Sequence, residues 1–146
     1  MNVDYDQEPP FPVADYRAMQ RAIRGVEALY LLVRAALDSL LQEQARVLLV
    51  GAGGGRQIET LAPSPKGYSF IAVDPSVAML DQARACAAAC AAQDRTMFIP
   101  GLVYDVPEQP VCDAATSLLV CTFWLTTGRR LTTWLRSGAG CGAADR

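Results

Sequence analysis

The chain has 146 residues, enough for one domain, and 51% of them are hydrophobic against 19% charged. This composition predicts a globular protein with a substantial core and excludes an intrinsically disordered chain. The net charge of −2 gives no general basis for nucleic-acid binding, and neither a membrane-length apolar run nor a basic signal-peptide start is present, so we expect a cytoplasmic location.

Two segments precede the first predicted strand. Residues 1–13 contain Pro9, Pro10 and Pro12 and are expected to form a flexible lead-in. Residues 14–45 form an N-terminal helical segment, because apolar side chains recur at steps of three and four, and Gly25 marks a point where two helices would divide. This segment either covers a ligand or packs on a sheet as an ordinary amphipathic helix, and the sequence favours neither.

Residues 46–125 alternate between predicted strands and helices. Strands are expected at 46–50, 69–73, 96–100 and 114–123, with helices at about 55–61 and 76–92. Ser76 is the expected N-cap of the second of these helices. The alternation predicts an α/β fold of the Rossmann-like three-layer sandwich type, with a parallel sheet and right-handed crossovers.

A glycine-rich turn directly follows the first predicted strand. Gly51, Gly53 and Gly55 allow the backbone to take up positive φ and to approach a ligand closely. Asp74 follows the next strand, where a carboxylate is placed to bind ribose hydroxyls. Together these features predict a nucleoside-cofactor site.

The spacing of the glycines indicates which cofactor. The dinucleotide fingerprint G-x-G-x-x-G would require a third glycine at position 56 or 58, where this chain has Arg56 and Ile58. That third glycine lets a helix N-terminus pack closely against a pyrophosphate. The spacing therefore favours a cofactor without phosphates over a dinucleotide.

The stretches from Val47 to Gly55 and from Val73 to Arg84 resemble motif I and the acidic strand end of class I S-adenosylmethionine-dependent methyltransferases. The resemblance implies S-adenosyl-L-methionine as cofactor and a parallel sheet of order 3-2-1-4. It also implies that Gly51, Ala52 and Gly53 pass under the amino-acid portion and ribose of the cofactor, while Gly55 opens the following helix.

The resemblance implies further cofactor contacts after the second and third strands. Asp74 would accept two hydrogen bonds from the ribose hydroxyls and Pro75 would lie against the adenine, although Asp74 could instead cap the helix that starts near Ser76. After the third strand the family's usual acidic position is Leu102 here, so backbone groups of Leu102 or Val103 are expected to read the adenine edge.

Two departures from the family pattern concern charged side chains. The acidic residue that usually stands two places before the first glycine is Leu49 here, which weakens the expected anchoring of the methionine end. Asp105, in the segment after the third strand, is expected to be a solvated loop residue.

We assign no catalytic residue, because methyl transfer from a sulfonium is driven largely by positioning.

The five cysteines and the absence of histidine argue against a metal centre. No C-x-x-C pair is present, and a Cys-His catalytic pair is impossible. Cys86 and Cys90 stand one helical turn apart and are expected to act as small apolar residues on a packed face.

The C-terminal part of the chain departs from the family. Class I methyltransferases have a seven-stranded sheet, relative to which the four strands here are incomplete, and residues 126–146 form an atypical tail. No acidic residue occurs from 114 to 144. We hypothesise that the tail is read out of frame, since codons taken one nucleotide earlier force Leu in place of Trp124 and permit Asp in place of Thr126 and Thr127, as related enzymes have at the end of strand 4.

The sequence leaves three functions open. The first is methyl transfer to an unknown small-molecule or RNA acceptor, with turnover by this short chain in question. The second is a non-catalytic cofactor-binding or oligomerisation module, and the third is a nucleotide-dependent oxidoreductase domain. An exposed edge at the fourth strand would also favour a homodimer.

Overall fold

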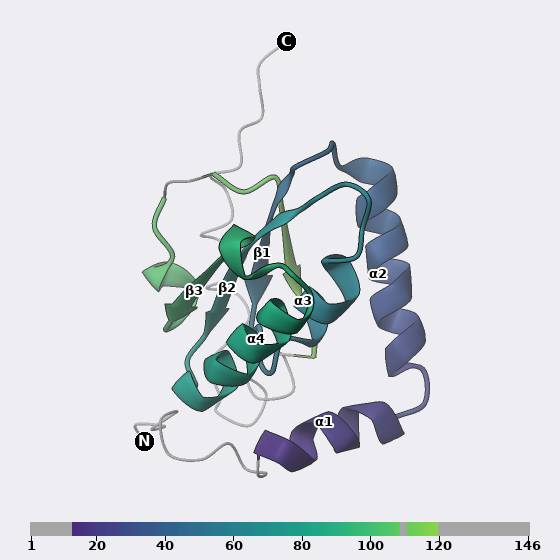
Figure 1. Cartoon of the computed structure of the whole chain (residues 1–146), viewed down its shortest axis with the longest axis vertical. Coiled ribbons are helices and arrows are strands. Elements are labelled where there is room, and N and C mark those ends of the chain that lie inside the picture. The colour runs from purple at the N-terminus through teal and green to yellow at the C-terminus, as the bar shows by residue number, and fades with distance from the viewer. Residues whose placement is uncertain (1–12, 109–110, 120–146) are drawn as a thin grey trace, which may run out of the picture.

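The computed structural model describes residues 13–108 and 111–119. Figure 1 shows a parallel sheet with helices packed against it. The elements are, in chain order, α1 (Val13–Ala22), α2 (Val26–Leu40), β1 (Arg46–Val50), α3 (Arg56–Leu61), β2 (Ser69–Asp74), α4 (Val77–Ala89), the 3-10 turn η1 (Gln93–Arg95), β3 (Thr96–Pro100), the 3-10 turn η2 (Val103–Asp105) and β4 (Ala114–Ser117).

The strands form one parallel sheet in the order β3-β2-β1-β4. In the register, Val47 of β1 lies between Phe70 of β2 and Ala114 of β4. This order confirms the predicted Rossmann-like topology, which is partial relative to a seven-stranded sheet. Because all strands run in the same direction, the residues that follow β1, β2 and β3 meet at one edge of the sheet.

The core lies between the sheet and the helices α2, α3 and α4. Side chains of one sheet face, including Val47, Leu49 and Phe70, pack against Ile58 of α3 and Leu80 of α4. Within the described residues no α-helix connects β3 to β4, and α2, α3 and α4 cover one face of the sheet (Figure 1). The second helical layer of the predicted sandwich is thus not seen in the described part of the chain.

The predicted division of the N-terminal helical segment is confirmed. Gly25 has φ +89° and separates α1 from α2, with nothing within 4 Å of the place where a Cβ would stand. In Figure 1, α1 lies beyond the carboxyl ends of the strands, while α2 runs along the side of α3. The helices of the described residues include none that is long and apolar enough to cross a membrane.

Asp38 of α2 anchors this helix to the segment that enters β2. Its Oδ1 accepts hydrogen bonds from the Ser64 hydroxyl at 2.6 Å and from the Tyr68 hydroxyl at 2.8 Å. Burial alone would raise the pKa of Asp38, but these two hydrogen bonds and the nearby Arg34 guanidinium outweigh it and lower that pKa. The contact stabilises the amino ends of the strands, opposite the predicted cofactor site.

The fourth strand is shorter than predicted. The expected strand at 114–123 ends at Ser117; residues 118 and 119 are not in a strand, and residues 120–123 lie outside the described part. The lead-in at 1–12 and the tail at 126–146, with its proposed change of frame, also lie outside it.

Candidate functional site

The glycine turn after β1 has the backbone conformation that its sequence predicts. Gly51, Gly53 and Gly55 have φ of +65°, +51° and +86°, values that residues with a side chain rarely adopt. The Ala52 amide donates to the Val73 carbonyl at 3.0 Å, so the turn is held beside the carboxyl end of β2. This arrangement leaves the turn without side chains between Ala52 and Arg56, where a ligand would have to approach closely.

Gly55 does more than open α3. A Cβ at this position would stand 2.9 Å from the Cα of Ala83 and 2.9 Å from the Cβ of Cys86, both in α4. The absence of a side chain therefore lets α3 pack directly against α4. The sequence predicts that Gly55 opens the helix after the turn, but it does not indicate this packing role.

Asp74 joins the glycine turn to the start of α4. Its Oδ2 accepts a hydrogen bond from the Gly53 amide at 2.8 Å, and its Oδ1 accepts one from the Ser76 amide at 2.9 Å. The side chain is 9% exposed, and this burial raises its pKa, while the two amide hydrogen bonds act in the opposite direction.

The two amides leave Asp74 with spare hydrogen-bonding capacity. An ionised carboxylate has about four acceptor positions, so about two remain for hydroxyl groups of a ligand. The alternative role considered for Asp74, a local cap near Ser76, is therefore compatible with binding ribose. Ser76 itself caps α4 as predicted, because its hydroxyl accepts from the Met79 amide at 3.3 Å. Pro75 lies between the two, half-buried.

The loop after β3 lies next to the same strand ends. The Gly101 amide donates to the Asp74 carbonyl at 3.0 Å. Asp105 was expected to be a solvated loop residue, and its side chain is exposed. It also caps η2, because its Oδ2 accepts a hydrogen bond from the Leu102 amide at 2.7 Å. Of the backbone groups predicted to contact the adenine, the Leu102 amide is thus already used within the loop.

The structure adds residues of α1 to this edge. Burial is the main cause that raises the pKa of the Tyr16 phenol, and the charge of the Asp74 carboxylate raises it further. Gln20, also on α1, is buried, as is Tyr30 of α2. A glutamine among the inward positions of an amphipathic helix was the signal in the sequence that could have indicated these residues.

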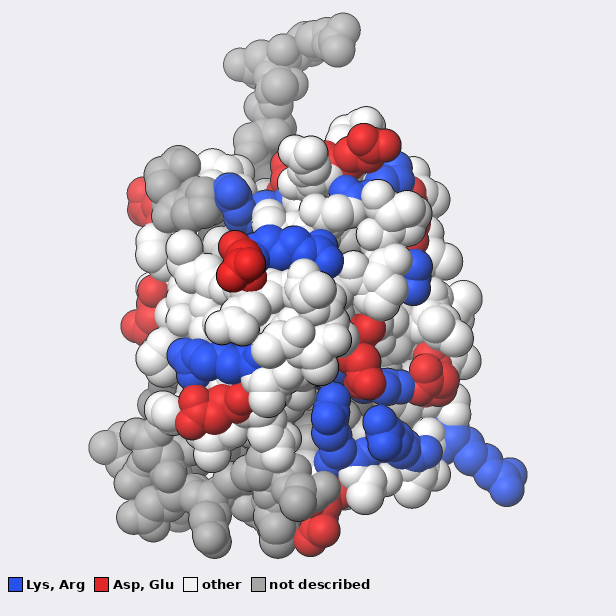
Figure 2. All heavy atoms as spheres, in the orientation of Figure 1, with Lys and Arg blue, Asp and Glu red and all other residues white. Residues whose placement is uncertain are grey.

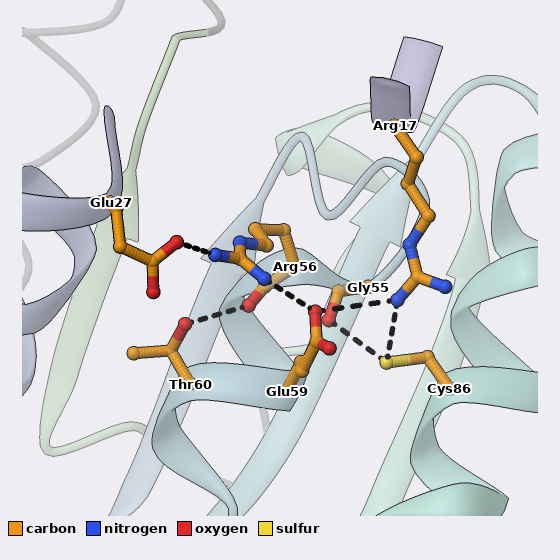
Figure 3. Close-up of polar contacts among 7 residues, drawn as sticks. All are labelled: Arg17, Glu27, Gly55, Arg56, Glu59, Thr60 and Cys86. Carbon is orange, nitrogen blue, oxygen red and sulfur yellow. Dashed lines mark hydrogen bonds and ion pairs between the residues drawn. The ribbon is translucent and has the colours of Figure 1, made fainter. Parts of the chain in front are cut away.

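A chain of charged contacts holds α1 and α2 against the start of α3 (Figure 3). Arg56 pairs with Glu27 of α2 and, at 2.8 Å, with Glu59 of its own helix. Arg17 of α1 reaches the same Glu59 carboxylate at 3.4 Å and the Cys86 sulfur at 3.5 Å. The N-terminal helices are thus tied to the helix that follows the glycine turn.

The cysteines of α4 are packing residues, as predicted. Cys86 is buried and its thiol donates to the Gly55 carbonyl at 3.4 Å, while Cys90 is partly buried against the core. Burial raises the pKa of the Cys86 thiol, which disfavours the nucleophilic thiolate. Among the described residues no group of three or more His, Cys, Asp or Glu side chains is placed to hold a metal ion.

The glycine turn and the carboxylate at the end of β2 form the candidate site at the carboxyl edge of the parallel sheet. Residues 48–138 match the model of the methyltransferase domain family. The chain belongs to the methyltransferase domain family. No curated protein sequence matches it.

Solved structures similar to this methyltransferase domain share its fold. A methyltransferase from Thiobacillus denitrificans that depends on S-adenosylmethionine, solved with S-adenosyl-L-homocysteine, is 26% identical, with a TM-score of 0.54, and the match covers 71% of this chain and 42% of that one. A Geobacter sulfurreducens methyltransferase, solved with the same ligand, is 23% identical, with a TM-score of 0.60 and coverage of 87% and 50%.

A structure from Methanococcus maripaludis, described as a putative methyltransferase of the same kind, is 19% identical, with a TM-score of 0.68 and coverage of 89% of this chain and 59% of that one. The chain thus spans about half the length of the structures it matches. The part it shares with them contains the glycine turn and Asp74.

Proposed function

We propose that this methyltransferase domain binds S-adenosyl-L-methionine at the carboxyl ends of β1 and β2. The observation that carries the proposal is the buried Asp74 carboxylate, which is tied to the Gly53 amide at 2.8 Å and retains acceptor positions for ribose hydroxyls. The two relatives solved with S-adenosyl-L-homocysteine support the choice of cofactor.

The other contacts of the proposed site are those that the family resemblance implies. Gly51, Ala52 and Gly53 would lie under the ribose and the amino-acid portion, and Pro75 and the Val103 amide would flank the adenine. Bound S-adenosylmethionine supplies a methyl group activated on a sulfonium. What the chain has to do is hold this group in line with a nucleophile, and no acid or base is needed unless the nucleophile must lose a proton.

The test is calorimetric titration of the full chain with S-adenosylmethionine and S-adenosylhomocysteine. We expect a dissociation constant on the order of micromolar, weakened by a factor of about ten or more in Asp74→Ala because hydrogen bonds to a charged group are lost. Asp94→Ala, which removes an exposed carboxylate in η1, is the matched control and should bind as the wild type does.

Failure of the wild-type chain to bind either ligand would contradict the proposal. NAD should produce no heat, because the glycine spacing does not suit a pyrophosphate. A chain that binds S-adenosylmethionine yet methylates neither small-molecule nor RNA acceptors would instead be a non-catalytic binding module.

The charges on the described surface favour no single class of acceptor. Figure 2 shows acidic and basic side chains interspersed over the face that carries α3 and α4, with the basic ones gathering near α1. Ion pairs such as Arg84–Asp81 and Arg34–Asp38 contribute to this mixture. A small molecule or an RNA therefore stays open as acceptor.

A homodimer through β4 stays a prediction. Within the described residues β4 pairs with β1 alone, and an unpaired strand edge favours pairing with a second copy of the chain. Sedimentation analysis of the full chain should show a dimer whose dissociation follows concentration, and a monomer at all concentrations would contradict it.

A further inference from the structure

The side of α2 that faces away from the core is apolar and exposed. Leu32 is 68% exposed and Leu40 is 76% exposed, although the opposite side of the same helix is buried against the core. The exposed apolar side chains recur at steps of three and four, so they share one side of the helix. We call them the α2 outer face, which consists of Leu29, Leu31, Leu32, Ala35, Ala36 and Leu40.

The charged side chains of α2 form a separate stripe and are used within the molecule. Glu27 pairs with Arg56 of α3 (Figure 3), and Arg34 pairs with Asp38 at 3.5 Å. The hydroxyl of Ser39, which is exposed beside the α2 outer face, donates to a carbonyl of its own helix at 2.7 Å. The α2 outer face therefore has no polar side chain that requires water, and a contiguous apolar patch of this kind marks an interaction surface.

The two ends of α2 carry opposite charges. Arg24 stands two residues before the helix and Glu43 three residues after it, and both are exposed. Neither belongs to an ion pair among the residues that the structure describes. The helix macrodipole has the same sense, positive at the start of the helix and negative at its end. A second copy of α2 that runs antiparallel to the first would therefore bring unlike charges together at both ends.

We propose that the α2 outer face is a homodimer interface, in which two copies of α2 pack antiparallel about a two-fold axis. Such an axis places the same surface on both sides of the contact, so a single self-complementary face is sufficient. Ala35 and Ala36 let the two helices approach closely, and Leu32 of each copy packs against the other helix between them. Arg24 of each copy lies near Glu43 of the other.

This interface is distinct from the edge of β4. It uses a helix at the outer edge of the helical layer, as Figure 1 shows, and it requires no pairing of strands. One helix from each copy forms a small interface, so we expect a weak dimer whose formation depends on concentration.

The experiment is sedimentation equilibrium of the full chain from micromolar to millimolar concentration. Leu32→Glu should raise the dissociation constant of the dimer about tenfold or more, because it brings a charge against apolar side chains in both halves of the interface. Met97→Glu is the matched control, since Met97 is an apolar side chain of β3 that is 45% exposed. It should leave the dissociation constant unchanged, and thermal unfolding checks that both variants are folded.

Two charge reversals test the antiparallel arrangement. Arg24→Glu and Glu43→Arg each bring like charges together twice, so each alone should weaken the dimer about threefold or more at low ionic strength. An equimolar mixture of the two variants should regain the affinity of the wild type, because each copy then supplies the charge that the other needs. A mixture that associates no better than the separate variants would overturn the antiparallel pairing.

Three further outcomes would overturn the inference. A wild-type chain that is monomeric at all concentrations would leave the α2 outer face to another protein or to a lipid surface. A dimer that survives Leu32→Glu would use another interface, such as the edge of β4. Association that continues beyond twice the mass of the chain would be non-specific. None of these outcomes depends on the binding of S-adenosylmethionine, so they leave the proposed function untouched.

Discussion

The Cys86 thiol donates a hydrogen bond to the Gly55 carbonyl at 3.4 Å, across a contact between α3 and α4 that leaves no room for a side chain at Gly55. The residue that opens the helix after the glycine turn is thus also the point where the two helices of the site touch. Substitution there tests packing and backbone conformation together.

Gly55→Ala should lower the free energy of unfolding by about 2–4 kcal/mol, the sum of an unfavourable positive φ and an overpacked contact. Gly25 offers a matched control, because its φ of +89° is close to the +86° of Gly55 while nothing lies within 4 Å of its Cβ position. Gly25→Ala should cost only about 1–2 kcal/mol. Urea unfolding measures both, and equal losses would show that packing against Cys86 contributes nothing.

Cofactor affinity should depend on the ionisation of Asp74. Burial raises the pKa of this carboxyl above 3.8, and the ribose contact requires the ionised form as an acceptor. The affinity for S-adenosylhomocysteine should therefore fall as the pH is lowered through this raised pKa, and calorimetry from neutral pH down to the lowest pH at which the fold persists would measure it. Asp74→Ala should show no such dependence.

The contribution of Asp74 to stability should have the opposite pH dependence from cofactor affinity and should decrease as the pH rises. A folded-state pKa above the unfolded value favours the protonated form in the fold, so its contribution is full below pH 3.8 and is lost as the pH rises through the folded pKa. The stability of Asp74→Ala relative to the wild type should therefore rise with pH. A wild-type affinity that is unchanged at acid pH, with the fold intact, would argue against Asp74 as the ribose acceptor.

Asp38 should govern the acid side of the stability curve. Its folded pKa is lowered below 3.8, so its contribution is present above that pH and is lost as the pH falls through the folded pKa. Asp38→Ala should cost about 1–3 kcal/mol at neutral pH, because the buried Tyr68 hydroxyl loses its acceptor.

Asp38→Asn separates charge from hydrogen bonding at this position. Both donors, Ser64 and Tyr68, bind Oδ1, and an asparagine keeps that oxygen. The variant should therefore be more stable than Asp38→Ala and should lose the acid dependence of the wild type. Unfolding curves between about pH 7 and about pH 3 measure this, and identical slopes for wild type and Asp38→Asn would refute it.

Gln57 of α3 and Thr116 of β4 form a buried polar pair, in which the threonine hydroxyl donates to Oε1 at 2.5 Å. Thr116→Val should destabilise the fold by about 1–3 kcal/mol, since the Gln57 carbonyl is left buried without this donor. Combining it with Gln57→Leu should cost less than the sum of the single changes. A double-mutant cycle in urea measures the coupling, and simple additivity would mean that the pair does not stabilise the contact of β4 with α3.

The reading frame of residues 126–146 can be tested on the gene. The match to the family model extends to residue 138 of the sequence as it stands, which includes part of this segment. Only the gene can therefore distinguish a native tail from one produced by a change of frame. If the frame has changed, the resequenced gene should continue the methyltransferase pattern in the frame one nucleotide earlier. A gene without such a continuation would refute the hypothesis.

Much of the fold was predictable from short-range patterns. The strands at 46–50 and 96–100 occur where the sequence places them, and the helices begin and end within a few residues of their predicted limits. The glycine turn at 51, 53 and 55 was predictable because backbone with positive φ favours glycine. The carboxylate at 74 was predictable because an acceptor at this strand end is typical of a ribose site. The prediction was less accurate for β4, where the strand ends at Ser117.

The sequence by itself thus determined the class of fold, the sheet order through family resemblance, and the glycine turn with Asp74, since each is encoded in residues close together along the chain. Only the tertiary structure decided that Asp105 occupies the Leu102 amide, that Gly55 touches Cys86, and that Arg17 of α1 reaches Glu59 of α3. The last two contacts join helices far apart in sequence. They depend on how whole elements pack, and no local pattern of residue types specifies that packing.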